Sequence, residues 1–282
     1  MGLTVGDVAG WMDEWYPPAL AAKWDRVGLI VGGRRSPVAR ILLAVDPVDA
    51  VLQQALDLQV GMVVTHHPLY LRGTSFVSED DAKGRLVSEL IRRDVALFNA
   101  HTNADVAPGG VAEALATLLG LQAQRPMEPV PAPTGVGGDF GYGRVGRLPS
   151  SVSLREFATH VAERLPAGPT GILVGGDLDR TVETVAVSGG SGDSFLGLAT
   201  TLGVDAYVTA DLRHHPASEH LEDGGPALVC GSHWATEWPW LPVLATKLSD
   251  RARAENAPLE VQVSRLVTEP WTLHLPTEGT TL

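Results

Sequence analysis

Cysteine, long apolar runs and clustered positive charge are all scarce in this sequence. The only cysteine, Cys230, excludes an intrachain disulfide framework and fits a reducing, cytoplasmic environment. No apolar stretch reaches the roughly 18 residues that a membrane-spanning helix needs. The first residues also lack the basic and apolar regions of a secretory signal. We therefore expect a soluble cytoplasmic protein that has no membrane partner.

Basic side chains are outnumbered by acidic ones. The 21 Lys and Arg residues face 33 Asp and Glu residues, for a net charge of −12, and no Lys/Arg-rich block occurs. This balance argues against nucleic acid as a partner. With 44% hydrophobic and 19% charged residues, the composition is that of a globular protein, and 282 residues suffice for two lobes with cores of their own.

Short apolar strands alternate with helices along most of the chain, which predicts βαβ units and an α/β fold. In the first half we expect helices at 4–16, 47–58 and 83–93, another ending near 119, and strands at 28–33, 40–46, 61–65 and 95–99. In the second half we expect helices at 154–165, 194–202 and 234–248, and strands at 141–147, 181–188, 204–209, 227–230 and 259–263.

The order of elements over 40–68 recurs over 181–216. In both stretches an apolar strand and a helix precede a strand containing Val-Thr and then His-His-Pro. We interpret this as an internal duplication. It predicts two related lobes at 1–121 and 141–282, joined by a Pro- and Gly-rich linker at 122–140, with mixed sheets flanked by helices and histidines facing one cleft. Because Val-rich βαβ units are common, an accidental echo is the alternative.

Two adjacent histidines, His66 and His67, end one of the predicted strands. Pro68 has no N–H for a strand ladder, so it should end the strand and leave both imidazoles at the carboxyl edge of the sheet. That edge is where α/β proteins bind their ligands. An isolated His-His pair is usually an ordinary surface pair. Three further polar clusters make a metal site the better interpretation here.

Each of the other clusters also follows a predicted strand. They are His101 with Asp105; Asp211, His214, His215 and Glu219; and His233 with Glu237, four residues apart on one helix face. Imidazoles and carboxylates without thiolate suit Zn, Mn, Fe, Co or Ni. So many donors exceed what one catalytic ion needs. They suit two divalent transition-metal ions roughly 3.5–4 Å apart that share a water. Taken alone, the His233–Glu237 pair would be read as a surface ion pair.

A glycine-rich stretch, Gly189–Ser194, follows a strand and opens a helix. Its N–H groups could bind an anion, although a plain turn with a helix cap is an equal reading. It lacks the lysine of a P-loop and the spacing of a dinucleotide-binding fingerprint. We assign Trp234, Trp238 and Trp240 to the core or to subunit contacts.

Six motifs, WDRVGLIVGG, VTHHPL, NAHTNADVAPGGV, SGGSGDSFL, DAYVTADLRHH and GSHWATE, together carry a resemblance. In this order they resemble the GTP cyclohydrolase I type 2 homologue family, also called the NGG-interacting-factor-three-like family, from the N-terminus to about Glu237. Arg26 stands where the family usually has Asn, and Trp234 where it usually has Tyr.

This resemblance implies a duplicated α/β fold, two metal ions between the lobes and a ring-shaped homohexamer built as a trimer of dimers. The implied metal ligands are His66, His67, Asp105, His233 and Glu237, with Glu237 or Asp105 bridging the ions. His101, His214 and His215 would line the same cleft.

Two hypotheses follow. The first is a dinuclear metal-dependent hydrolase in which His101 or His215 carries protons. The family name suggests GTP or a related nucleotide as its small-molecule substrate, although no residue here points to guanine. The second is a metal-binding interaction or chaperone protein without turnover.

Overall fold

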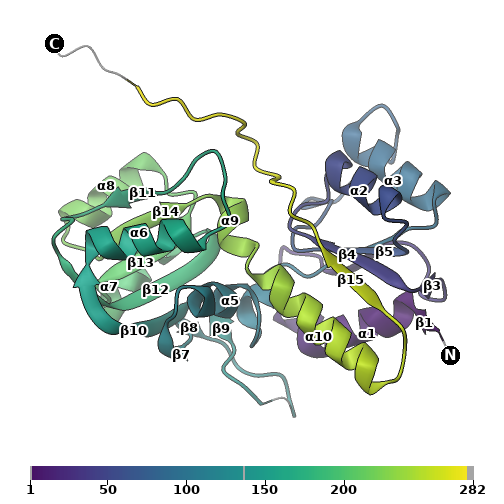
Figure 1. Cartoon of the computed structure of the whole chain (residues 1–282), viewed down its shortest axis with the longest axis horizontal. Coiled ribbons are helices and arrows are strands. Elements are labelled where there is room, and N and C mark those ends of the chain that lie inside the picture. Colours follow the sequence, from purple (N-terminus) through teal and green to yellow (C-terminus); the bar gives the residue numbers. More distant parts are fainter. Residues whose placement is uncertain (1, 136, 278–282) are drawn as a thin grey trace.

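Each lobe of the protein is built on one mixed β-sheet, and helices lie between and outside the two sheets (Figure 1). The computed structural model describes residues 2–135 and 137–277. The first sheet has the strand order β15-β4-β5-β6-β2. Its strands are β2 (Gly28–Val31), β4 (Arg40–Ala44), β5 (Met62–Thr65), β6 (Ala96–Asn99) and β15 (Glu260–Val263).

The second sheet has the strand order β11-β14-β13-β12-β10-β7. Its strands are β7 (Gln122–Arg125), β10 (Arg144–Ser153), β11 (Leu173–Gly175), β12 (Thr181–Ser191), β13 (Ala206–Ala210) and β14 (Ala227–Gly231). Two short pairs complete the strands of the described residues: β1 (Leu3–Thr4) with β3 (Pro37–Val38), and β8 (Glu128–Pro129) with β9 (Gly141–Tyr142).

Four strands of each sheet share an order and a set of directions, whereas the next strand is parallel in the first sheet, β15 beside β4, and antiparallel in the second, β10 beside β12. In the first, β4, β5 and β6 are parallel and β2 pairs antiparallel with β6. In the second, β12, β13 and β14 are parallel and β11 pairs antiparallel with β14. In both, the antiparallel strand precedes the three parallel strands along the chain. The internal duplication itself stays a prediction.

Ten α-helices lie in the described residues. They are α1 (Val5–Trp15), α2 (Asp49–Asp57), α3 (Ala82–Arg92), α4 (Thr102–Val106), α5 (Val111–Leu118), α6 (Leu154–Arg164), α7 (Leu196–Leu202), α8 (His214–Glu222), α9 (His233–Glu237) and α10 (Trp240–Ala254). Several begin where the sequence supplies a cap. Thr4 and Asp7 form a capping box at α1, and Ser153 and Glu156 form another at α6.

The core explains why the central strands read as continuous apolar runs. Neighbouring side chains of a strand point to opposite faces, and both faces of β4 are covered. Ile41 and Leu43 enter a core that runs through both lobes and includes residues of α1, α5 and α10, whereas Leu42 enters a second core under α2 and α3. A third core lies under α7 and α8. Both sheets therefore share the central helices.

Two predicted boundaries differ from the structure at the ends of the second lobe. The segment 122–140, predicted as a linker, contains β7, which pairs with β10 of the second sheet. Its residues Gln-Ala-Gln-Arg are largely exposed, so they carry no apolar alternation. The last strand, β15, pairs in parallel with β4 and so belongs to the first sheet rather than to a lobe at 141–282.

The helix predicted at 234–248 is instead two helices, α9 and α10. The break falls at Pro239, which precedes α10. Proline has no N–H to donate, and its ring clashes with the carbonyl four residues earlier, so a continuous helix cannot pass this point undisturbed. The break leaves α9 as a separate short helix that carries His233 and Glu237.

Candidate metal centre

Four histidines from the two lobes converge at the carboxyl ends of the parallel strands. His66 and His67 follow β5, His101 follows β6, and His233 follows β14. The ring centroids of His67 lie 5.1 Å from those of both His66 and His233, and those of His66 and His101 are 5.2 Å apart. The edge of the sheet predicted to bind a ligand is therefore where the imidazoles gather.

The carboxylate of Glu237 lies at the centre of this group and is only 4% exposed. Its Oε1 lies 3.1 Å from Nε2 of His233 and 3.4 Å from Nε2 of His66, and its Oε2 lies 3.1 Å from Nε2 of His67. Asp105 Oδ1 is 3.7 Å from Nε2 of His66. All five residues predicted as metal ligands thus lie in one cluster, which we call the histidine cluster together with His101.

The other ring nitrogen of each histidine is held by an oxygen outside the cluster. Nδ1 lies within hydrogen-bonding distance of an acceptor in every case: His66 with Ala100 O at 3.0 Å, His67 with Asp46 Oδ1 at 2.7 Å, His101 with Asp25 Oδ2 at 3.0 Å and His233 with Asp211 Oδ2 at 2.6 Å. A proton on Nδ1 leaves the lone pair of Nε2 directed into the cluster. This is how outer-shell partners orient metal-ligating histidines.

Sequence reasoning assigned none of these outer carboxylates to a histidine. No sequence pattern singles out Asp25 or Asp46, and Asp211 lies in the same cluster of the sequence as His214 and His215. Each does follow or flank a predicted strand, but their partners lie 76, 21 and 22 residues away along the chain. Only the closed sheets bring them together.

Opposite charges stabilise one another in the cluster. Burial alone would raise the pKa of Glu237, but His67, His66 and His233 hold it well below its usual range. Burial alone would lower the pKa of His233, but Glu237 and Asp211 raise it to about 9. The protons on these imidazoles occupy the place that a bound cation would take, so metal binding would release them.

The donor set fits transition-metal ions. Nε2 of His66 is buried and has no hydrogen-bond partner among the described residues. Two groups of three have ligand atoms within 4.8 Å of one another: His66, His67 and His101, and His67, His233 and Glu237. Buried nitrogen and carboxylate donors without thiolate match Zn, Mn, Fe, Co or Ni.

Gly190, in the glycine-rich stretch, packs directly against the cluster. A Cβ at this position would lie 2.3 Å from Glu237 Oε1 and 2.9 Å from His233 Nε2, and its φ of +66° is unfavourable for other residues. Its N–H donates to Thr236 Oγ1 and its carbonyl accepts from Thr209 Oγ1. These backbone groups are used within the protein, which favours close packing over the anion-binding interpretation.

Two cavities open onto the histidine cluster. The inner pocket, about 360 Å³, is lined by residues that include His101, Asp105, His233 and Glu237, together with Tyr142 and serines of the glycine-rich stretch. The outer pocket, about 690 Å³, is lined by His67, His101 and His233 and also by Trp24 and Trp271. A small molecule can therefore reach the cluster.

His215 is not brought to the cluster. It lies beside His214 in the exposed first turn of α8, where their ring centroids are 5.1 Å apart, and it lines neither pocket. Asp211, four residues earlier in the sequence, bonds to His233. The proton-transfer role assigned to His215 finds no support in this placement, whereas His101 lines both pockets.

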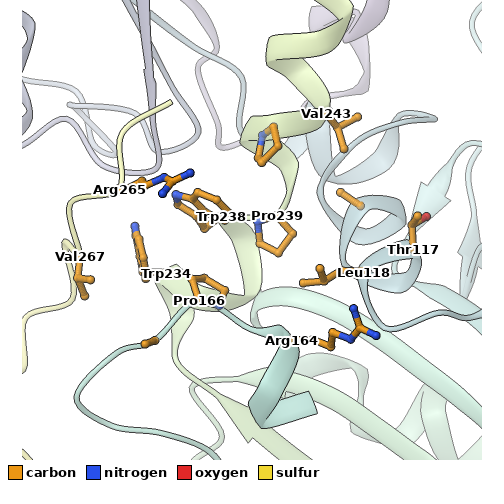
Figure 2. A pocket seen from close by; sticks show the side chains of 13 residues that line it. Thr117, Leu118, Arg164, Pro166, Trp234, Trp238, Pro239, Val243, Arg265 and Val267 are labelled. Atoms are coloured by element: carbon orange, nitrogen blue, oxygen red, sulfur yellow. The ribbon is translucent and has the colours of Figure 1, made fainter. Parts of the chain in front are cut away.

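A third cavity, about 510 Å³, borders α9 and the residues that follow it (Figure 2). Its walls are mostly apolar and include Trp234, Trp238, Pro239 and Leu118. It shares Trp234 with the outer pocket and contains no member of the histidine cluster. The structure therefore places Trp234 and Trp238 on cavity walls, while Trp240 is fully buried in the core.

The fold and the cluster define an α/β protein of two mixed sheets with a candidate metal centre between them. The chain belongs to the Duf34/NIF3 (NGG1p interacting factor 3) family, whose sequence profile matches residues 3–270. Among the described residues, no helix has both the length and the apolar character needed to cross a membrane.

Several relatives align with nearly the whole chain. A protein of Streptomyces coelicolor named GTP cyclohydrolase 1 type 2 homolog is 48% identical over 95% of this chain and 94% of its own length. A protein of the same name from Mycobacterium tuberculosis is 32% identical over 97% of this chain and 98% of its own. The crystal structure of a Bacillus cereus protein related to NIF3 superimposes with a TM-score of 0.89, covering 97% of this chain and 99% of that one. At 23% identity, this last likeness supports the fold alone.

Proposed function

We propose that this protein is a dinuclear metal-dependent hydrolase that acts through a metal-activated water. The proposal depends above all on the position of Glu237, whose two carboxylate oxygens face different histidines, Oε1 toward His66 and His233 and Oε2 toward His67. A carboxylate so placed suits the bridge between two ions. His66, His67, Asp105, His233 and Glu237 would hold them.

When bound, two such ions would lower the pKa of a shared water and stabilise negative charge that develops on a substrate oxygen. The protein's own contribution is to orient the ligands and to move protons. His101 is the residue we assign to proton transfer. Its Nδ1 is held by Asp25, which also accepts from the Thr102 hydroxyl at 2.7 Å, and its ring borders both pockets.

The outer pocket favours a substrate with a flat apolar part. Trp24 and Trp271, which line it, are 60% and 64% exposed, although large aromatic side chains are usually buried. Indole rings bind nucleobases by stacking. Together with the names of the relatives, this supports a nucleotide such as GTP as the substrate class. A substrate of this kind and the single cysteine, Cys230, fit a cytoplasmic enzyme.

Metal analysis by plasma mass spectrometry tests the proposal. We expect about two transition-metal ions per chain in the purified protein. Glu237→Ala should lose most of this metal, whereas Glu219→Ala, on the exposed face of α8, should keep it. A protein that is free of metal and binds no added Zn²⁺ or Mn²⁺ would refute the hydrolase proposal.

Turnover separates the hydrolase from a metal-binding protein without activity. The metal-loaded protein would be screened against nucleotides by chromatography of the products. Hydrolysis that disappears in His66→Ala, while folding by circular dichroism persists, supports catalysis at the cluster. Full metal occupancy without turnover of any nucleotide would favour the metal-binding interaction or chaperone role.

A further inference from the structure

The C-terminal segment Ser264–Trp271, which we call the strap, runs beside the histidine cluster. It leaves β15 in the first lobe, passes α9 of the second lobe, and the chain then extends away from both lobes (Figure 1). The strap has no regular secondary structure, so its course is set by its contacts. Those contacts lead to His67 and to the helix that carries His233 and Glu237, three ligands of the proposed metal centre.

The first contact leads to His67. The hydroxyl of Thr268 donates to Oδ2 of Asp46, while the other oxygen of the same carboxylate, Oδ1, lies 2.7 Å from Nδ1 of His67. Asp46 is therefore held at both oxygens and has little freedom to rotate. The direction of the His67 ring depends on this chain of two hydrogen bonds, which begins on the strap.

The second contact leads to α9. The carboxylate of Glu269 accepts the backbone N–H of Trp234 at 2.8 Å, in the first turn of α9 and next to His233. At the other end of this short helix, the indole N–H of Trp238 donates to the carbonyl of Ser264 at 2.8 Å. The helix that carries His233 and Glu237 is thus bonded to the strap near both of its ends.

Packing keeps the strap against α9. Figure 2 shows Arg265 and Val267 on the strap, across the apolar cavity from Leu118 and Thr117, with Trp234 and Trp238 between them. Further along, Thr268, Glu269 and Trp271 line the outer pocket. The strap therefore lines both the apolar cavity and the outer pocket, and it also bonds to residues that hold the cluster.

We propose that the strap positions the metal centre, with Thr268 orienting His67 through Asp46 and Glu269 fixing α9. Both are positioning residues, since neither lies among the ligand atoms of the cluster. The inference rests on the proposed metal centre. Mutation of an outer-shell partner of a metal-ligating histidine typically weakens metal binding about 10–100-fold. Thr268 bonds to such a partner, Asp46, so removing its hydroxyl should have an effect at the lower end, about 10-fold.

The test measures Zn²⁺ affinity of the full chain by competition with a chromophoric chelator. Thr268→Val should bind Zn²⁺ about 10-fold more weakly than the unaltered chain, and Thr268→Ser, which restores the hydroxyl, should recover the affinity. Thr272→Val is the matched control, because Thr272 is exposed and makes no side-chain hydrogen bond among the described residues. Thermal unfolding of each variant verifies that the fold is retained.

Double substitution separates positioning from a general loss of stability. In an Asp46→Ala background, Thr268→Val should cause no further loss of affinity, because the route to His67 is already broken. Equal affinity of Thr268→Val and the unaltered chain would overturn the inference and leave the metal centre standing. If the unaltered chain itself binds no Zn²⁺ or Mn²⁺, the metal centre fails, and the inference fails with it.

Discussion

Glu237 shows how much the cluster depends on single side chains. It is a buried carboxylate surrounded by imidazoles, and each imidazole has a fixed acceptor behind it. Removing any one partner leaves an uncompensated charge or an unpaired nitrogen in a buried place, which is costly. The roles of individual residues can therefore be tested one at a time.

Gly190→Ala should abolish metal binding with little change in the rest of the fold. The added Cβ would occupy the space 2.3 Å from Glu237 Oε1, and the positive φ would add backbone strain. Metal content measured by plasma mass spectrometry gives the result. Gly197→Ala in α7 is the control, because nothing lies within 4 Å of its Cβ. Full metal occupancy in Gly190→Ala would show that this close approach is not needed.

The residues that depart from the family pattern have structural roles. The guanidinium of Arg26 folds back on its own loop and donates to the carbonyls of Lys23 at 3.1 Å and Asp25 at 2.6 Å. Trp234 is buried and packs at a ring distance of 6.4 Å from Trp238. Neither places a charge in the histidine cluster, so both departures are compatible with a metal centre.

Hydrogen bonds in the connection before β13 also stabilise the fold. Asp205, which precedes β13, accepts the N–H groups of Glu183 and Thr184 and the hydroxyl of Thr184, at 2.7–3.0 Å. Burial alone would raise the pKa of Asp205, but these hydrogen bonds lower it below its ordinary value. The ionised carboxylate therefore joins β12 to β13.

Asp205→Asn should lower stability in a pH-dependent way. A carboxylate whose pKa is lowered in the folded state stabilises the fold fully above its unfolded pKa of about 3.9, and this contribution is lost as the pH falls through the folded pKa. Urea unfolding from pH 7 down to about 3 measures the difference in unfolding free energy between the two chains. The difference should shrink toward low pH, and a difference independent of pH would contradict this account.

At the scale of the whole molecule, the two lobes share one core. Residues of α1, α5 and α10 pack between the sheets and join side chains of both into one buried cluster. The first and last parts of the chain meet there, since Trp240 Nε1 donates to the hydroxyl of Tyr16 at 3.1 Å. We therefore expect the two lobes to unfold together.

Leu244→Ala tests this shared core. Leu244 of α10 is fully buried, so the cavity should cost about 2–5 kcal/mol of unfolding free energy. Hydrogen exchange of amides in β5 and β13 should accelerate together, because both sheets lose the same support. Faster exchange confined to one sheet would show that the lobes unfold independently.

Much of the fold could be predicted because its signals are local. The strand residues Ile41 to Leu43 are buried on both faces and so read as an apolar run. The helix caps at Thr4 and Ser153 lie next to the residues they bond. Strand β7 has no such signal, since it is an exposed edge strand whose only apolar residue is Ala123. The pairing of β15 with β4 joins segments more than 200 residues apart, and no local pattern encodes it.

By itself, the sequence determined the α/β class, the repeated order of elements and the imidazoles and carboxylates that meet in the histidine cluster. The histidines follow strand ends, and within each sheet the parallel strands bring those ends to one edge. That the edges of the two sheets meet depends on the helices packed between them. Only the tertiary structure decided which residues hold those donors. Asp25, Asp46 and Asp211 behind the rings, Gly190 against Glu237, and the strap beside His67 are contacts between distant segments. Their partners depend on how the sheets and central helices close in three dimensions, which spacing along the chain does not record.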